Sequence, residues 1–267
     1  MTSTRVAVVT LCSAARLPHL RNQLRALEPT GVARIVVWIG DDEPPVLDAD
    51  RVVRVPPGRD GLRLAAGRNA GAREARRSGA ELFVFLDADC VPGPSMLERY
   101  VAAWHRHPHA VLCGPVTYLP AGADLAPAAL AAATAPHAAR PAPPAGVDLV
   151  AEPEEYPLFW SLSFAVGAAT WTGVGGFDDG YEGYGGEDTD FAFAMRAGSV
   201  PLVWGGGADA YHQHHPTTSP PWQHLDDILR NGARFAAKWG EWPMRGWLDA
   251  FAAAGAIEWR GDTWRRV

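Results

Sequence analysis

The chain has 267 residues, of which 48% are hydrophobic and 20% are charged, and its formal net charge at pH 7 is −6. A chain of this length and composition can bury a large core, so we expect one globular domain. The acidic balance provides no extended basic face, which argues against nucleic acid or an anionic membrane surface as a partner.

The cysteines and the first residues of the chain indicate in which cellular compartment the protein is located. Cys12, Cys90 and Cys113 lack any CxxC spacing, which is typical of reduced thiols rather than of a disulfide framework or a zinc site. The apolar run at 5–11 is too short for a membrane span and is soon followed by Arg16. We therefore expect a cytoplasmic protein without a membrane span.

Strands and helices alternate through the first ninety residues. Runs of β-branched and other apolar residues predict strands over 5–11, 33–43, 50–57 and 81–89. Leucine and alanine at helical spacing predict helices over 17–27 and 62–79, with Gly79 ending the second. This alternation predicts an α/β fold with a mostly parallel central sheet.

Polar residues lie at the carboxyl ends of the predicted strands, namely Thr10, Asp41, Asp42, Asp87 and Asp89. Ligands of open parallel sheets bind beyond the carboxyl ends of the strands, so these side chains predict an acidic binding edge. Two carboxylates held close together repel each other unless a cation neutralises them. Oxygen ligands of this kind suit Mg2+ or Mn2+ bound together with substrate phosphates, and a simple Asp turn cap after the strand is the alternative.

Residues 120–148 are rich in alanine and proline and have no clear apolar period. We interpret them as a mobile crossover segment that closes over a ligand, because long loops inside compact domains are often lids. A solvent-exposed linker with a short helix at 124–134 is an equally good interpretation.

Glycines, acids and aromatic residues crowd together in 173–198, and a helical pattern then begins near Glu187 and ends at Gly198. Acids in a first helical turn can simply complement the helix dipole. The flat rings of Phe177, Tyr181 and Tyr184, however, also offer faces on which a sugar can stack.

A further apolar run at 200–216 predicts a strand that delivers His212, His214 and His215 at its end. One of these histidines can complete a metal site begun by Asp89. The alternative is a solvated turn before Pro216, and the spacing alone does not separate the two.

Taken together, six segments resemble the inverting nucleotide-sugar glycosyltransferases of family 2, which have the GT-A fold. The similar segments are "TLCSAARLPHLRNQLRAL", "GRNAGAREA", "FVFLDADC" with its DxD motif, "GGFDDGYEGYGGEDTDF", "AYHQHHP" and "NGARFAAKWG". The C-terminal half looks most like that of galactosyltransferases and chondroitin polymerase. The resemblance implies one GT-A domain over 1–267, divided into a nucleotide-sugar half (1–119), a flexible segment (120–150), an acceptor half (151–221) and C-terminal helices (222–267).

The resemblance also implies roles for single residues. It places Asp87 near the nucleotide ribose, Asp89 and His212 on the metal, and Asp188 as the catalytic base. The implied reaction moves a sugar from a nucleotide sugar, most simply a UDP-sugar, to an acceptor hydroxyl with Mn2+ or Mg2+ as the cofactor. A base opposite the leaving group implies inversion at the anomeric carbon.

Other positions form the surroundings of the two substrates in this comparison. The residues expected around the nucleotide and diphosphate are Thr10, Arg16, Asp41, Arg68 and Asn69. The residues expected around the acceptor are Tyr181, Tyr184 and Glu187. Asp41 and Asp42 are adjacent, so the sequence does not decide between them.

Two other functions remain as alternatives. "FLDADCV" also resembles the aspartate motif of haloacid-dehalogenase-like phosphatases, but the single lysine, Lys238, is not followed by the acidic pair that this class needs. A non-catalytic carbohydrate-binding protein can keep the same fold. Five tryptophans between Trp239 and Trp264 are interpreted as core or as a subunit interface, which leaves a homodimer open, rather than as an amphipathic membrane contact.

Overall fold

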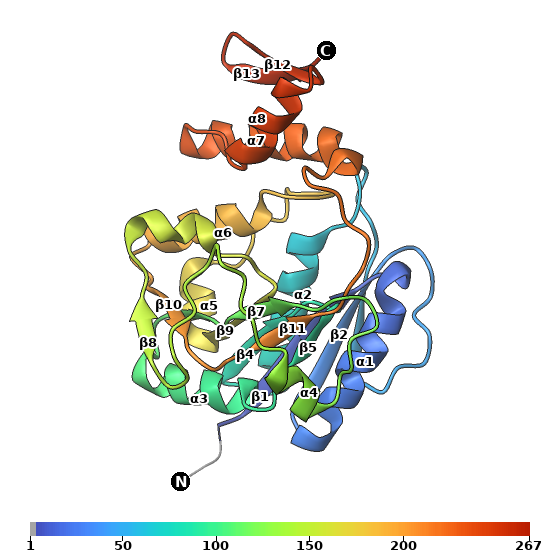
Figure 1. Ribbon diagram of the computed structural model, residues 1–267, viewed down its shortest axis with the longest axis vertical. Helices are drawn as coiled ribbons and strands as arrows, with labels where there is room; N and C mark the ends of the chain where they lie inside the picture. Colours follow the sequence, from blue (N-terminus) through green and yellow to red (C-terminus); the bar gives the residue numbers. More distant parts are fainter. Residues whose placement is uncertain (1–3) are drawn as a thin grey trace.

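The computed structural model describes residues 4–267 and is built on one large sheet (Figure 1). Its eight strands lie in the order β3-β2-β1-β4-β9-β6-β10-β8. They are β1 (Val6–Cys12), β2 (Ala33–Ile39), β3 (Arg51–Val55), β4 (Leu82–Leu86), β6 (Val111–Cys113), β8 (Asp148–Val150), β9 (Ser163–Gly167) and β10 (Leu202–Gly205). The first four strands in this order, β3, β2, β1 and β4, are parallel to one another. Strand β9 runs antiparallel to both β4 and β6, and β8 runs antiparallel to β10. The predicted α/β fold with a mostly parallel sheet is confirmed.

Helices flank this sheet and extend beyond it. They are α1 (Leu17–Leu27), α2 (Leu64–Arg77), α3 (Met96–Arg106), α4 (Pro127–Ala132), α5 (Ala168–Val174), α6 (Glu187–Ala197), α7 (Leu225–Trp239) and α8 (Arg245–Ala253). Figure 1 shows α7, α8 and the hairpin of β12 (Ile257–Arg260) and β13 (Thr263–Arg266) at the end of the molecule farthest from the N-terminus. None of the helices in residues 4–267 combines the length and the apolar character that a membrane crossing requires.

A second, three-stranded sheet joins two distant parts of the chain. It consists of β5 (Cys90–Pro92), β11 (Ala210–His212) and β7 (Val116–Tyr118), with β11 in the centre. In the antiparallel β5–β11 pair, His212 lies opposite Cys90. This small sheet therefore brings the end of β11 beside the DxD turn that connects β4 to β5.

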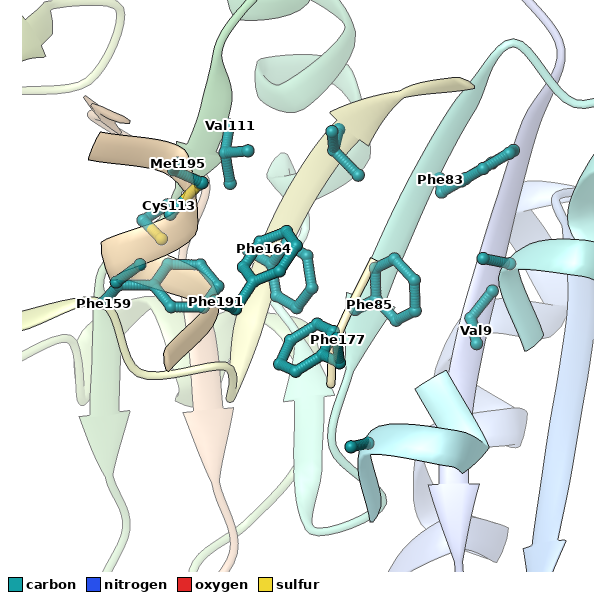
Figure 2. Close-up of a cluster of buried hydrophobic side chains, with 14 of the residues drawn as sticks. Val9, Phe83, Phe85, Val111, Cys113, Phe159, Phe164, Phe177, Phe191 and Met195 are labelled. Carbon is teal, nitrogen blue, oxygen red and sulfur yellow. The ribbon is translucent and has the colours of Figure 1, made fainter. Parts of the chain in front are cut away.

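Aromatic rings fill the core between the large sheet and α6 (Figure 2). The ring of Phe85 on β4 stacks on that of Phe164 on β9 with centroids 4.5 Å apart. Phe177 stacks on Phe191 of α6 at 4.3 Å. Such buried aromatic contacts contribute strongly to stability, and here they hold α6 against the sheet.

Helix α2 packs unusually close to β1 and β2 because two of its inward positions are glycine. A Cβ atom at Gly71 would lie 2.3 Å from Cγ1 of Val9, and one at Gly67 would lie 2.9 Å from Cδ1 of Ile39. The absence of a side chain is thus a packing requirement at both positions. Arg68, which follows Gly67, is carried by this closely packed helix.

Three segments differ from the sequence prediction in detail. The strand expected over 33–43 ends at Ile39, and the exposed acids after it lie in a loop. The single strand expected over 200–216 is two strands, β10 and β11, in different sheets. The segment 120–148 contains the short helix α4 and contacts β7 through a bridge between Thr117 and Pro136, so it has defined contacts with the body of the protein.

Candidate active site

The DxD turn leaves the end of β4 and is fixed by main-chain hydrogen bonds. The amide of Asp87 donates to the carbonyl of Leu162 (2.9 Å), and the amide of Cys90 donates back to the carbonyl of Asp87 (2.8 Å). The carbonyl of Asp89 accepts a hydrogen bond from the amide of Gln213 (2.7 Å), one residue beyond β11. The backbone therefore holds Asp89 next to the segment that carries the histidines.

Asp89, His212 and His215 form a cluster whose potential ligand atoms all lie within 4.8 Å of one another. Nε2 of His212 is 3.6 Å from Oδ1 of Asp89, and Nε2 of His215 is 3.2 Å from Oδ2. His214 is exposed, and its carbonyl contacts Nε2 of His19 at 3.3 Å. The structure thus places His212, which the resemblance put on the metal, beside Asp89, together with His215, which the sequence left as one of three candidates.

The charges of this cluster match those of a metal site. Burial disfavours the ionised form of Asp89, but the hydrogen bond from His215 and the charges of His212, His215 and Arg16 outweigh it, so its pKa is lowered. Burial also lowers the pKa of His212, against the attraction of Asp89. An ionised carboxylate and a neutral imidazole are the forms that bind divalent metals. The donor set therefore fits such an ion.

Arg16 lies against the same carboxylate. Its Nε is 3.2 Å from Oδ2 of Asp89, and its Nη2 is 3.3 Å from Nδ1 of His215. The guanidinium is about one-third exposed, so it is accessible from solvent at the edge of the cluster. Such a cation suits the phosphates of a nucleotide.

A buried arginine connects the DxD turn to the start of α6. Arg68 is 4% exposed, and its guanidinium lies 3.5 Å from Oδ1 of Asp87 and 3.2 Å from Oε1 of Glu187. The same group lies over the ring of Phe177, 5.0 Å from its centroid. Burial raises the pKa of Asp87 to about 7, with the charge of Arg68 opposing the shift and those of Asp89 and Glu187 adding to it.

Asp188 is in the first turn of α6, which begins after Gly186 in the left-handed conformation (φ 93°). Within the described residues, no side chain forms a cap hydrogen bond at this helix start. One oxygen of Asp188 instead accepts from the amide of Thr189 (2.8 Å). Burial, together with the charge of Glu187, raises the pKa of Asp188 to about 7. A carboxyl with such a pKa is suited to accept a proton near neutral pH.

Two aromatic residues border this group of carboxyls. The half-exposed ring of Tyr118 stacks on His212 at 4.6 Å, and Tyr184 stacks on His224 at 4.3 Å. Burial and the nearby charges of Asp188 and Glu187 raise the pKa of Tyr184 to about 12. Tyr184 was expected near the acceptor; Tyr118 was missed, because no local motif marks it and only the pairing of β7 with β11 brings it to His212.

Several residues expected in the site lie elsewhere or contact protein groups. Tyr181 is 2% exposed, and its hydroxyl donates to Asp190, so its ring belongs to the core rather than to an open acceptor pocket. Thr10 is buried and donates to Gln23 (2.7 Å). Asp41 is exposed in the loop after β2.

Asn69 has a structural contact instead of an open face. Its Nδ2 donates to the carbonyl of Phe177 (2.7 Å) and to Oδ1 of Asp179 (2.6 Å), while its Oδ1 accepts from the amide of Phe177 (2.9 Å). Asn69 therefore fixes the loop before α6 onto α2, and its neighbour Arg68 reaches the carboxylates.

Comparison with known proteins finds similarity to glycosyltransferases. Residues 44–134 match the model of the family described as glycosyl transferase family 2. This part of the chain is similar to glycosyl transferase family 2. The DxD turn and the parallel strands β3 and β4 lie within the matched part of the domain.

Curated relatives are glycosyltransferases of greater length. Validoxylamine A glucosyltransferases of Streptomyces hygroscopicus subsp. jinggangensis (strain 5008) and subsp. limoneus are each 27% identical to the domain over 192 residues. The match covers 64% of this chain, and 45% and 42% of the two relatives respectively. The chain therefore spans less than half the length of these relatives.

Solved structures share the fold at low sequence identity. GalNAc-T7, crystallised with UDP, GalNAc and Mn2+, has a TM-score of 0.60 and 16% identity, over 88% of this chain and 48% of that protein. Residues 1–349 of Staphylococcus aureus TarS give a TM-score of 0.57 and 14% identity, over 88% of this chain and 65% of that one. The domain has the GT-A fold of these glycosyltransferases.

Proposed function

We propose that the domain is a metal-dependent, inverting glycosyltransferase that moves a sugar from a nucleotide sugar to an acceptor hydroxyl. The observation that carries the proposal is the connection through Arg68. This buried guanidinium contacts Asp87, next to the Asp89–His212–His215 cluster, and Glu187, next to Asp188. A candidate metal site and a carboxyl with a raised pKa are thereby parts of one site.

Asp89, His212 and His215 would hold the metal ion. Two imidazoles and one carboxylate favour Mn2+ over Mg2+, because Mg2+ binds oxygen ligands almost exclusively. When bound, the ion would stabilise the negative charge that develops on the departing diphosphate. Arg16 at the edge of the cluster would bind the same phosphates, since guanidinium groups form strong hydrogen bonds to phosphate oxygens.

Asp188 would act as the general base. The acceptor oxygen forms a bond to the anomeric carbon while the bond from that carbon to the nucleoside diphosphate breaks, and the hydroxyl proton passes to Asp188. A positioned base of this kind contributes a rate factor of about 100 to 10,000. Because no protein nucleophile enters this scheme, the reaction proceeds by one displacement with inversion.

Two features support the choice of substrates. The GT-A neighbour GalNAc-T7 was crystallised with UDP and Mn2+, and the curated relatives are named as glucosyltransferases. We therefore propose a UDP-sugar, with UDP-glucose as the first candidate. The stacked pair Tyr184 and His224 near Asp188 would contact a carbohydrate or another small hydroxyl acceptor.

The test is release of UDP from purified protein supplied with UDP-glucose, UDP-galactose, UDP-GlcNAc and UDP-GalNAc in turn, with Mn2+ or with excess chelator. We expect at least one donor to be turned over with Mn2+ and activity to vanish with chelator and in Asp89→Ala. A protein that binds UDP and Mn2+ but turns over no donor, with or without sugar acceptors, would instead be a non-catalytic binding protein.

A further inference from the structure

Two neighbouring side chains of α1 contact the two segments that supply the candidate metal ligands. Gln23 is completely buried, and its Nε2 donates to the carbonyls of Asp87 (2.7 Å) and Cys90 (2.8 Å). Its Oε1 accepts from the hydroxyl of Thr10 on β1 (2.7 Å). Gln23 thus connects both ends of the turn that carries Asp89. Because its amide is buried, removing these hydrogen bonds would leave the carbonyls of Asp87 and Cys90 without this partner, which costs stability.

Asn22 makes the corresponding contact on the histidine side. Its Nδ2 donates to Oε1 of Gln213 (2.6 Å), and Nε2 of Gln213 donates to the carbonyl of His19, also on α1 (3.2 Å). Gln213 is 5% exposed, and its amide donates to the carbonyl of Asp89 (2.7 Å). Gln213 lies between His212 and His215 in sequence. Its side chain therefore connects the segment that carries both histidines to α1.

We propose that Asn22, Gln23 and Gln213 are positioning residues that fix the separation between Asp89 and the two histidines. The inference rests on the proposed metal site. The three ligands come from two segments far apart in the sequence, and metal binding needs them placed to within about 0.5 Å. Hydrogen-bonded side chains and carbonyls that hold ligands in place commonly change metal affinity by about 10- to 100-fold when they are removed.

The first measurement is Mn2+ affinity, obtained by electron paramagnetic resonance of free Mn2+ in a titration without donor or acceptor. Asn22→Ala and Gln213→Ala should bind Mn2+ about 10- to 100-fold more weakly than the parent. Arg21→Ala is the matched control, because Arg21 is an exposed residue of the same helix, and it should bind as the parent does. Gln23→Ala removes a fully buried side chain, so Asn22→Ala, which is only partly buried, carries the test if Gln23→Ala does not fold.

The second measurement distinguishes this proposal from the proposed function. Imidazole resonances of His212 and His215 in metal-free protein should shift or broaden in Asn22→Ala and Gln213→Ala but not in Arg21→Ala. If the parent binds no Mn2+, or Asp89→Ala binds it equally well, the metal part of the proposed function fails, while the imidazole resonances still test the positioning role. Unchanged Mn2+ affinity in both variants when the parent binds the ion, or unchanged imidazole resonances when it does not, would overturn the proposal.

Discussion

Asp188 is the residue at which binding and chemistry can be separated. A base acts mainly in the transition state, so Asp188→Asn should lower kcat by about 100- to 10,000-fold and leave the affinity for donor nearly unchanged. If Asp188 only complemented the helix dipole at the start of α6, asparagine would cost about 0.3–1 kcal/mol of stability and leave kcat unchanged. The measurement is kcat together with calorimetric UDP-sugar affinity, after melting temperatures have been matched. A kcat within a few-fold of the parent would remove Asp188 as the base.

The raised pKa of Asp188 also sets the direction of the pH dependence. A general base must be ionised, and burial together with Glu187 raises the pKa of this carboxyl to about 7. Below that pH the group is protonated and inactive, so kcat should rise as the pH increases through about 7 and level off above it. A pH–rate profile from pH 5 to 9 tests this expectation. A profile that is already flat at pH 5 would contradict it.

The histidine cluster gives a prediction with an internal control. His212→Ala and His215→Ala should each weaken Mn2+ binding and UDP release, because both imidazoles lie beside Asp89. His214→Ala should behave like the parent, since His214 is exposed and lies outside the cluster. Mn2+ titration of the three variants is the measurement. Loss of affinity in His214→Ala alone would show that the cluster has been assigned wrongly.

At the scale of residues, the sequence predicted which residues would lie in one site but not the direction in which each side chain points. Asp89 with His212, and Arg68 with Asp87 and Glu187, were expected in one site and lie together. His215 could not be selected, because the path of the chain after β11 is irregular and no periodicity applies to it. Tyr181 was misplaced because its burial depends on packing against α6 and α7, which the local pattern does not reveal.

Among the elements, α7 is anchored to α6 by polar contacts that converge on one carboxylate of α6. Asp190 is 2% exposed and accepts from Nζ of Lys238 (2.8 Å), Nε1 of Trp239 (2.7 Å) and the hydroxyl of Tyr181 (3.3 Å). A hydrogen bond to a charged group makes a net contribution to stability of about 1.5–3 kcal/mol. Since Lys238 is partly exposed, we expect Asp190→Ala to lower the free energy of unfolding by about 2–3 kcal/mol.

Chemical denaturation of Asp190→Ala and Asp190→Asn measures this contribution. Asparagine keeps an acceptor for Trp239 and Tyr181, so its loss of stability should be smaller. Equal stability of both variants and the parent would show that the contacts of Asp190 do not help to hold α7 in place.

The regular elements were predicted well where one periodicity covered the whole element. The helix expected over 17–27 is α1 with the same bounds, and the strand expected over 5–11 is β1 displaced by one residue. The segment 200–216 was wrongly predicted as one strand, because the four residues 206–209 that separate β10 from β11 interrupt the apolar pattern only briefly. The contacts of 120–148 depend on partners such as β7, which are distant in sequence.

For the whole molecule, we expect Mn2+ and UDP to raise the free energy of unfolding when they bind. Because the proposed site joins β4, α2, α6 and β11, a ligand bound there favours the folded state over the unfolded one. At 100 times its dissociation constant, a ligand adds about 2.7 kcal/mol. For a chain of this size that corresponds to a rise in Tm of about 5–10 °C.

Thermal unfolding with Mn2+ and UDP together, compared with each alone, is the measurement. Asp89→Ala is the control, and it should show a smaller rise because the candidate metal site is lost. An unchanged Tm at saturating Mn2+ and UDP would contradict a site that links these elements.

The pairing of β11 with β5, in which His212 lies opposite Cys90, has a consequence for the protein as it is made. A ribosome releases the N-terminal part of a chain first, and that part can begin to fold before the rest is synthesised. A nascent chain that has reached β7 already holds Asp87 and Asp89, but the central strand of the small sheet, β11, and both histidines are still missing. Capture of the ion would then require synthesis to continue past His215, and a chain that terminates before β11 would retain the aspartates without the histidines.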